Sequence, residues 1–416
     1  PVPEPVPPVI PQAPKGTDDT LPPASETWRQ LLRGFEDLAV RYGYGLTMTP
    51  LFEATELFSR GVGEETEVVE KQMYTFDDKS GRSLTLRPEA TASVVRAYLG
   101  AGRQGVFKGY YAGPMFRDEQ PQSGRRRQFF QVGVEYLAEP SPDADVEVIE
   151  VGYRLLEQAG IEGVTVRLNS IGDPADRTAY REALVEFLTA RVDSLSEDAR
   201  RRIDTNPLRV LDSKADAAVI ADAPAPLDAI GGEAAAHFAA VRAGLERRGI
   251  PYEITPRLVR GLDYYNRTVF EYVASSYTAA QDALGGGGRY DPLAEMLGGP
   301  SVPAVGLAMG VDRIVLAMPE PEEPGPDVFV VAAGPERRGD ALDLVGRLRD
   351  AGLWSEMDLG DRSLKAQFKV AGRRRARYVA VVGDEWADGE VTMRRMSDGE
   401  EQRVAIEEVA AWPTGR

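Results

Sequence analysis

The stretch Tyr110–Tyr136 gathers side chains that suit a charged, planar ligand. Its polar centre, Asp118–Arg126, lies between two apolar runs, which predicts a long β-hairpin. Because side chains alternate along a strand, one face of the second strand should carry Arg127, Phe129, Gln131, Gly133 and Glu135. These groups suit a ligand with a ring, an anion and an ammonium group. The alternative is a solvated hairpin with salt bridges.

Arginines cluster at both ends of this polar centre. Arg117 ends the first predicted strand, and Arg125–Arg127 begin the second. A guanidinium can grip two phosphate oxygens at once, so the hairpin is a candidate phosphate site. Acidic residues outnumber basic ones, 66 to 49. A chain of this charge should contact nucleic acid only through such local basic stretches.

The elements around the hairpin divide the chain into segments. Residues 1–14, half of them proline, predict an extended tail. Apolar residues at helical spacing predict a helix over Glu26–Tyr42. An Ala-, Arg-, Glu- and Leu-rich stretch, 175–250, predicts a helical insertion, and PEPEEPGP at Pro319–Pro326 reads as a linker. Alternating strands and helices predict a small α/β domain over 327–416.

Composition excludes several kinds of site. The chain of 416 residues has no cysteine and one histidine, His237. Disulfides, thiolate metal sites, zinc and a cysteine nucleophile are therefore not expected. His237 lies in an Ala-rich stretch and is expected to be a helix residue of the insertion without a catalytic role. No membrane-spanning run or signal peptide is visible, so we expect a cytoplasmic protein.

The hairpin resembles motif 2 of the class II aminoacyl-tRNA synthetases. Met48–Ser59, with Pro50, is similar to their motif 1, and Val305–Met318 to their motif 3. LVRGLDYYNRTVFEYV (258–273) and GGGGRYD (285–291) resemble the two histidine-specific motifs of the histidyl-tRNA synthetase family. RPEAT (87–91), NPLRVLDSK (206–214) and SLKAQFKVA (363–371) also look like that family, so the resemblance covers most of the chain.

The resemblance implies an α+β fold. A class II antiparallel-sheet catalytic core would occupy 15–174 (motifs 1 and 2) and 251–318 (histidine motifs and motif 3), interrupted by the insertion. The linker would be 319–326, and 327–416 a C-terminal α/β anticodon-binding domain with five strands. Motif 1 packs across a twofold axis in this family, which implies a homodimer.

The implied activity is histidine–tRNA ligation, with ATP and Mg²⁺ as the substrate complex and no organic cofactor. By similarity, Arg117 and Arg260 bracket the α-phosphate and are the catalytic residues. Arg125 would reach the γ-phosphate, and Glu119 would lie near the adenine edge. Phe129 and Arg313 would sandwich the adenine.

Histidine selection is implied for a second set of positions. Glu89, Thr91 and Gln131 match positions that hold the α-ammonium group. Glu135 and Tyr265 match those that hold the imidazole nitrogens, and Tyr290 would help to close the pocket. Taken alone, the pair Tyr264 and Tyr265 could be core packing, and Gly285–Gly288 could be a flexible or phosphate-binding loop.

The remaining expectations concern tRNA(His). Lys365, Lys369 and Arg373 are spaced four apart on one helical face and are expected to contact the tRNA backbone, although a solvated face is the plain alternative. Gln122 is a candidate for the acceptor end. The family pattern has Arg, Tyr and His where this chain has Gln120, Arg126 and Phe130, which puts acceptor-stem contacts in doubt.

Two alternatives remain open at this point. The regulatory subunit of ATP phosphoribosyltransferase resembles the synthetase core, but it lacks the C-terminal domain and the histidine-specific arginine motif. This chain has both segments. A class II synthetase for another amino acid is the second alternative, against which the RGLDYY and GGGGRYD segments argue.

Overall fold

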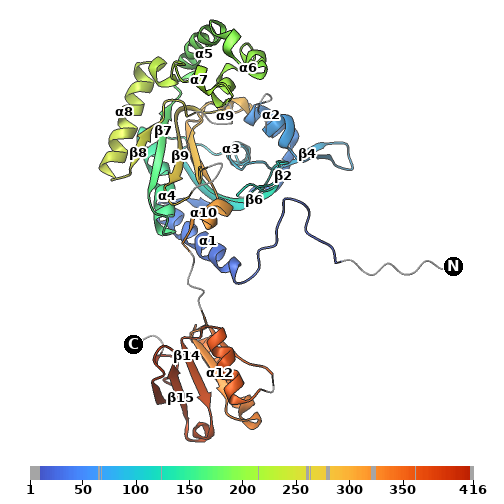
Figure 1. Cartoon of the computed structure of the whole chain (residues 1–416), viewed down its shortest axis with the longest axis vertical. Coiled ribbons are helices and arrows are strands. Elements are labelled where there is room, and N and C mark those ends of the chain that lie inside the picture. Colours follow the sequence, from blue (N-terminus) through green and yellow to red (C-terminus); the bar gives the residue numbers. More distant parts are fainter. Residues whose placement is uncertain are drawn as a thin grey trace, which may run out of the picture. The chain divides into compact units, whose positions relative to one another are not determined.

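The computed structural model describes residues 10–63, 66, 68–122, 124–213, 215–258, 262, 264–277, 282–319, 325–360 and 362–412. The chain forms two compact units, Pro1–Pro319 and Glu320–Arg416 (Figure 1). Each unit has its own hydrophobic core. The division falls inside the stretch predicted as a linker, and each unit is described by itself below.

An eight-stranded sheet forms the centre of the first unit, in the order β1-β5-β6-β11-β10-β9-β7-β8. Its strands are β1 (Gly45–Leu46), β5 (Phe107–Phe116), β6 (Gln128–Leu137), β7 (Val164–Ser170), β8 (Tyr252–Ile254), β9 (Asn266–Ala274), β10 (Gly285–Arg289) and β11 (Ala304–Gly310). The pairs from β5 across to β7 are antiparallel, while the edge strands β1 and β8 pair in parallel. The predicted antiparallel core is confirmed.

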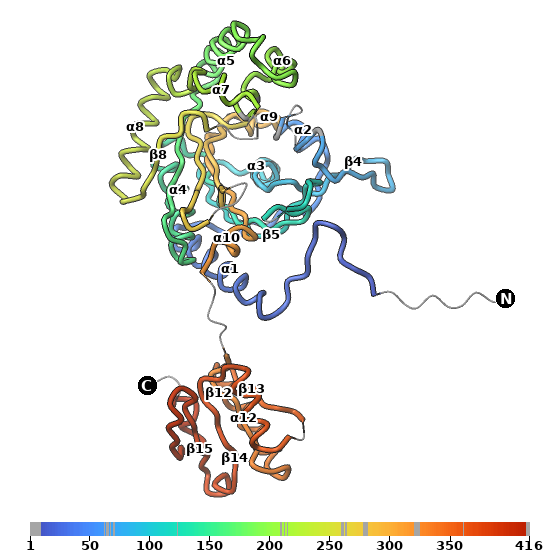
Figure 2. The backbone as a smooth tube through the Cα atoms, in the orientation of Figure 1, coloured from blue at the N-terminus to red at the C-terminus, as the bar shows by residue number. Residues whose placement is uncertain are grey.

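The predicted hairpin is β5 paired with β6. Val132 and Val134, on the face of β6 expected to be apolar, are fully buried in the main core. Helices α1 (Ala24–Arg41), α4 (Pro142–Gln158) and α8 (Gly232–Arg247) contribute to this same core (Figure 2). The opposite face of β6, with Gln131 and Glu135, is thereby left for the site.

Gly285–Gly288 form a regular strand, β10, so the expectation of a glycine loop is wrong. The reason is backbone crowding. A Cβ at Gly287 would lie 2.0 Å from the carbonyl oxygen of Gly306, and one at Gly285 would lie 2.7 Å from Met309. Glycine at these positions permits a close approach of β10 to β11 that side chains would prevent.

The inserted segment has a core of its own. Helices α5 (Pro174–Thr189), α6 (Glu197–Arg202) and α7 (Ala217–Ile220) pack around residues such as Tyr180, Leu184 and Ile203. Helix α8, predicted as part of the insertion, places Phe238 and Val241 in the main core instead. The part of the chain with this independent core is therefore shorter than the predicted insertion, 175–250.

Smaller elements surround the central sheet. Strands β2 (Phe52–Ala54), β4 (Ser83–Leu86) and β3 (Thr75–Asp77) form a separate sheet in that order. The remaining helices of this unit are α2 (Thr55–Val62), α3 (Thr91–Gly100), α9 (Leu293–Met296) and α10 (Val311–Ala317). No helix in the described part of the chain is long and apolar enough to cross a membrane.

The second unit is a five-stranded sheet in the order β13-β12-β14-β15-β16. The strands are β12 (Val328–Ala332), β13 (Ser355–Met357), β14 (Tyr378–Val382), β15 (Glu390–Arg395) and β16 (Glu401–Ala405). Helix α11 (Arg338–Asp350) packs with Val328 and Val330, and α12 (Leu364–Arg373) packs with Phe329 and Val331. Because these residues alternate, the two helices cover opposite faces.

Candidate active site

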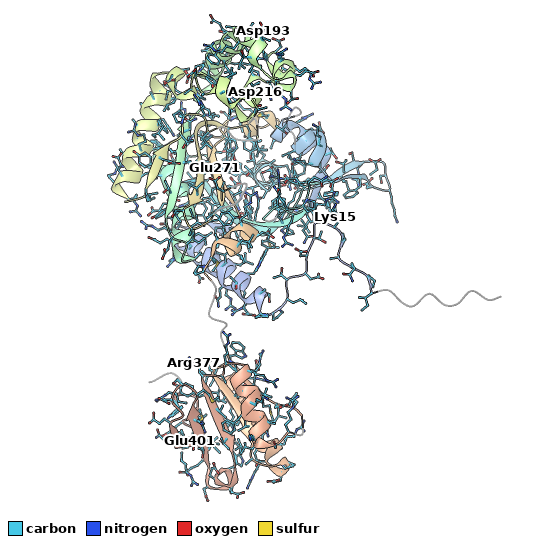
Figure 3. The ribbon with its side chains drawn as sticks, in the orientation of Figure 1. Lys15, Asp193, Asp216, Glu271, Arg377 and Glu401 are labelled. Atoms are coloured by element: carbon cyan, nitrogen blue, oxygen red, sulfur yellow. The ribbon has the colours of Figure 1, made fainter. Side chains whose placement is uncertain are left out.

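A cavity of about 500 Å³ opens on the face of the large sheet opposite α1 and α4. This volume is typical of small-molecule sites. Strand β9 contributes Glu271, which lies in the middle of the unit (Figure 3). The predicted residues that line the cavity are Glu89, Thr91, Arg117, Glu119, Arg125, Phe129, Gln131, Tyr265, Tyr290 and Arg313. Five separate stretches of sequence thus converge on one space.

Arg117 follows the last residue of β5, and its guanidinium is held in place by neighbouring groups. Nε donates to the carbonyl oxygen of Pro88 at 3.0 Å, and Cζ lies 5.3 Å from the centre of the Phe129 ring. Burial lowers the pKa of Arg117 to about 10, although the Glu89 carboxylate opposes the change. The side chain is therefore still a cation at neutral pH, in a place with little water.

Glu89 lies at the start of α3, where the chain supplies free N–H groups. Its carboxylate accepts hydrogen bonds from the backbone nitrogens of Thr91 and Ala92 at 2.6 and 2.9 Å. Unpaired N–H groups in the first turn of a helix favour an anion. Burial raises the pKa of Glu89, and these hydrogen bonds oppose that rise.

Glu135 is completely buried behind the cavity wall. Its Oε1 accepts from the hydroxyl of Thr91 at 2.7 Å, and its Oε2 accepts from the hydroxyl of Tyr290. Burial raises the pKa of Glu135 to about 8, although both hydrogen bonds oppose the shift. A Cβ at Gly306 would overlap Oε2, so glycine on β11 makes room for this carboxyl group.

Gln131 and a group of tyrosines complete this side of the cavity. The Gln131 Oε1 atom is buried and has no hydrogen-bond partner among the described residues, so an acceptor is available for a ligand N–H. The rings of Tyr264 and Tyr265 lie 4.7 Å apart, and those of Tyr264 and Tyr290 lie 5.6 Å apart. Tight aromatic packing of this kind fixes the position of each hydroxyl group.

The opposite side of the cavity is formed by the hairpin loop and α10. Arg313, near the start of α10 as predicted, donates from Nε to the oxygen of Gly124 and from Nη1 to that of Ala283, at 3.0 and 2.9 Å. Arg125 forms an ion pair with Glu119. Both residues of this pair were predicted to contact nucleotide, and in the structure they contact each other.

The other predicted residues lie elsewhere. Gln122 forms a tight turn with Arg125 in the hairpin loop. Lys365, Lys369 and Arg373 lie on an exposed face of α12 in the second unit. Arg260 lies outside the described residues.

Several residues of this region were not predicted from the sequence. Asp312 accepts from the backbone nitrogen of Phe130 at 2.9 Å, which joins α10 to the hairpin. Arg289, with no exposed surface, bonds to the carboxylate of Asp145, and His237 lies 3.2 Å from the same group. The sequence feature that could have pointed to Arg289 is its position beside Tyr290 in the GGGGRYD segment. Its partner Asp145 is 144 residues away and gave no signal.

Among the described residues, no group of three or more histidine, aspartate or glutamate side chains is arranged to hold a metal ion. The chemistry that the cavity offers is instead that of buried cations beside hydrogen-bonding carboxyl and phenol groups.

Comparison with known proteins identifies the family. The histidyl-tRNA synthetase family profile matches residues 16–314, and an anticodon-binding domain profile matches residues 327–413. A histidine–tRNA ligase of Bacillus subtilis is 43% identical over 408 residues, covering 95% of this chain and 96% of that protein. One from Desulforudis audaxviator is 46% identical over 407 residues, with the same coverage.

Solved structures agree with the sequence relatives. The crystal structure of the apo histidyl-tRNA synthetase of S. aureus superimposes with a TM-score of 0.79 at 35% identity. The match covers 97% of this chain and 99% of that one. With profile matches over most of its length and close relatives across nearly all of it, the chain belongs to the histidyl-tRNA synthetase family.

Proposed function

We propose that this chain is a histidine–tRNA ligase, which activates histidine with ATP and transfers it to the 3′ end of tRNA(His). One observation carries the proposal: a single cavity is lined by a buried guanidinium, Arg117, and by Tyr290, whose hydroxyl is bonded to the buried carboxyl group of Glu135 behind the wall. The first suits a phosphoryl group, and the second suits a ligand with ring nitrogens. As a supplier of aminoacyl-tRNA for translation, it would act in the cytoplasm.

The first step joins two anions. An oxygen of the histidine carboxylate attacks the α-phosphorus of ATP, the bond to the bridging oxygen breaks, and pyrophosphate leaves. Negative charge grows on the α-phosphate, so a fixed cation in a water-poor site lowers the barrier. Arg117 meets this requirement because its backbone and ring contacts hold it in place before substrate binds.

The nucleotide would occupy the side of the cavity between the hairpin loop and α10. Phe129 and Arg313 line this side and offer a ring and a planar cation to the adenine. Arg125 would leave Glu119 for the γ-phosphate, and Glu119 would then be near the adenine edge. We propose that ATP enters as its magnesium complex, for which Glu271 offers a carboxylate oxygen in the cavity.

Histidine would occupy the side nearer β6 and the tyrosines. The free acceptor of Gln131 and the carboxylate of Glu89 suit the α-ammonium group. Glu135 and Tyr265 suit the two imidazole nitrogens, with Thr91 and Tyr290 fixing the Glu135 carboxyl group. A substrate without these nitrogens would leave buried polar groups unpaired, and such sites can discriminate by roughly 10⁴ or more.

In the second step, a terminal ribose hydroxyl of tRNA attacks the histidyl carbonyl, and AMP leaves. A phosphate oxygen of the adenylate is our proposed proton acceptor. Lys365, Lys369 and Arg373 on α12 would contact the tRNA backbone, and Gln122 would meet the acceptor end. In this scheme 15–174 and 251–318 form the catalytic domain, 175–250 the insertion, and 327–416 the anticodon-binding domain.

The test is histidine-dependent exchange of pyrophosphate into ATP, with the other nineteen amino acids as controls. We expect exchange with histidine alone. Arg260, for which we propose a role at the α-phosphate, should be required, so Arg260→Ala should lose most of the exchange. Equal exchange with several amino acids would contradict the specificity, and normal exchange by Arg260→Ala would contradict its role.

A non-catalytic protein, similar to the regulatory subunit of ATP phosphoribosyltransferase, is the alternative. It would bind histidine without supporting exchange. The profile match to an anticodon-binding domain over residues 327–413 favours the ligase.

We also propose a homodimer. Apolar side chains are exposed along the chain from the edge strand β1 to the three-stranded sheet: Leu46 (60%) on β1, Met48 (85%) after it, and Phe52 (50%) on β2. The Phe52 ring packs edge-on against Phe76, also exposed, at 6.3 Å. Clustered apolar exposure of this kind marks a protein interface. Sedimentation should show a dimer that Phe52→Glu shifts towards monomer, and a monomeric wild-type protein would contradict the proposal.

A further inference from the structure

The histidine side of the cavity is physically joined to the first helix of the inserted segment. Arg177, on the first turns of α5, donates from Nη1 to the backbone oxygen of Tyr265 at 3.0 Å. Tyr265 itself is 7% exposed and lines the cavity. A side chain from the insertion therefore contacts the main chain of a residue at the ligand site.

The next residues along the chain strengthen this connection. Arg267 forms a two-point ion pair with Asp173, the N-cap of α5, at 2.6 and 3.0 Å. Its backbone N–H donates to the oxygen of Gly172 at 2.8 Å, and its oxygen accepts from the nitrogen of Ile171 at 2.9 Å. The segment 265–267 is thus bonded to the segment 171–177 by both backbone and side chains.

The backbone is strained at the same place. Arg267 has a φ of 47°, in the left-handed region that residues with a Cβ seldom occupy. Such a conformation is strained for a residue with a Cβ and persists where the surroundings enforce it. Here Gly172, Asp173 and Ile171 supply the enforcing contacts. This strained residue lies in the first positions of β9, directly before the pairing of Thr268 with Ser170 in the sheet.

The chain that leads into residues 265–267 is also bonded to β7. Asn169, fully buried, donates from Nδ2 to the oxygens of Pro256 and Leu258, each at 3.0 Å. Leu258 packs in the same apolar cluster as Tyr264, Tyr265 and Tyr290. Two side chains of the stretch 169–177 are therefore bonded to members of this apolar cluster: Asn169 to Leu258, and Arg177 to Tyr265.

We propose that Arg177 is a positioning residue for histidine binding: from α5 it holds the Tyr265 backbone so that the phenol faces the imidazole. It touches no substrate and acts through Tyr265. Through this contact, the inserted segment contributes to the affinity for histidine. This inference rests on the proposed function, because histidine is the ligand that Tyr265 would bind.

The alternative role for Arg177 is structural, fastening the insertion to the sheet. The two roles differ in their kinetic effects. Loss of a fastening contact lowers the amount of folded enzyme and changes the KM values for histidine and ATP alike. Loss of a positioning contact raises the KM for histidine and leaves the KM for ATP, because nucleotide binds on the side of the cavity away from Tyr265.

Arg181 provides a matched control. It lies one turn further along α5, and it too donates to a backbone oxygen, that of Asp204 at 2.5 Å. That bond lies wholly within the inserted segment. Arg181→Ala therefore removes the same kind of contact from the same helix without touching the segment 265–267.

The experiment compares Arg177→Ala, Arg177→Lys and Arg181→Ala in pyrophosphate exchange, with active sites titrated. We expect Arg177→Ala to raise the KM for histidine roughly tenfold, the effect of one hydrogen bond from a charged group. The KM for ATP should stay within about twofold by the same reasoning. Arg177→Lys should restore part of the loss, and Arg181→Ala should match the wild type.

An unchanged KM for histidine in Arg177→Ala would overturn the inference, as would a parallel rise in both KM values. Should Arg177→Ala not fold, Arg177→Gln carries the same test with the same criteria. Wild-type protein without histidine-dependent exchange would instead overturn the proposed function. The two failures are therefore distinguishable.

Discussion

Replacing Glu135 by glutamine removes a buried titratable group while keeping the shape of the side chain. In the absence of ligand, burial raises the pKa of this carboxyl group to about 8 from an ordinary value of 4.5. Between these two pH values the folded protein holds a proton here that the unfolded chain has lost. The contribution of Glu135 to stability is therefore fully present below pH 4.5 and is lost as pH rises towards 8.

The magnitude follows from the width of that window. Each pH unit changes the free energy of unfolding by about 1.4 kcal/mol while the two states differ by one proton. Between pH 5.5 and 8 the wild type should lose roughly 3 kcal/mol relative to Glu135→Gln, in which nothing titrates at this position. Thr91 and Tyr290 can still bond to the amide, because a hydroxyl rotates to donate or accept.

Calorimetric unfolding of both proteins across this range tests the prediction. The difference in stability should grow with pH, and all other titrating groups cancel in the comparison. A difference that stays constant from pH 5.5 to 8 would refute the reasoning, since it would mean that Glu135 is already ionised. In exchange assays, Glu135→Gln should raise the KM for histidine by tenfold or more, as a charge-assisted hydrogen bond is lost.

Two further predictions concern tRNA and the shape of the site. Neutralising Lys365, Lys369 and Arg373 together should weaken tRNA binding and reduce the slope of log affinity against log salt by about 2, while pyrophosphate exchange is unchanged. Unchanged aminoacylation at limiting tRNA would contradict this. Gly306→Ala places a methyl group on the Glu135 carboxyl group, so we expect exchange to fall by at least tenfold from a misplaced recognition group. Wild-type kinetics in this variant would show that the Glu135 carboxyl group moves aside without cost.

The sequence was sufficient where local patterns decide structure. Alternation in the second strand predicted the hairpin and also which face carries Gln131 and Glu135. In the second unit, alternating strands and helices were predicted from the local texture, and the predicted helical face with Lys365, Lys369 and Arg373 lies on α12. These features depend on residues close together in the chain, so the sequence contains the information directly.

Pairings between distant strands could not be predicted in this way. The register that sets Glu135 opposite Gly306 joins residues about 170 positions apart. The same limit explains why Gly285–Gly288 read as a loop. The need for glycine there arises from β11, which lies next to β10 only in the folded sheet. Likewise, the bond from Arg177 to Tyr265 has no local signature.

The only histidine of the sequence, His237, can serve as a spectroscopic probe. His237 lies on α8 with its Nε2 3.2 Å from Asp145, which is also bonded to Arg289, the neighbour of Tyr290. Uniform ¹⁵N-histidine labelling would give one protein ring signal to observe, without any engineered probe. Unlabelled histidine added to such a sample gives no signal in the nitrogen dimension. A chemical-shift change of the His237 ring would therefore report ligand binding from a position behind the recognition pocket.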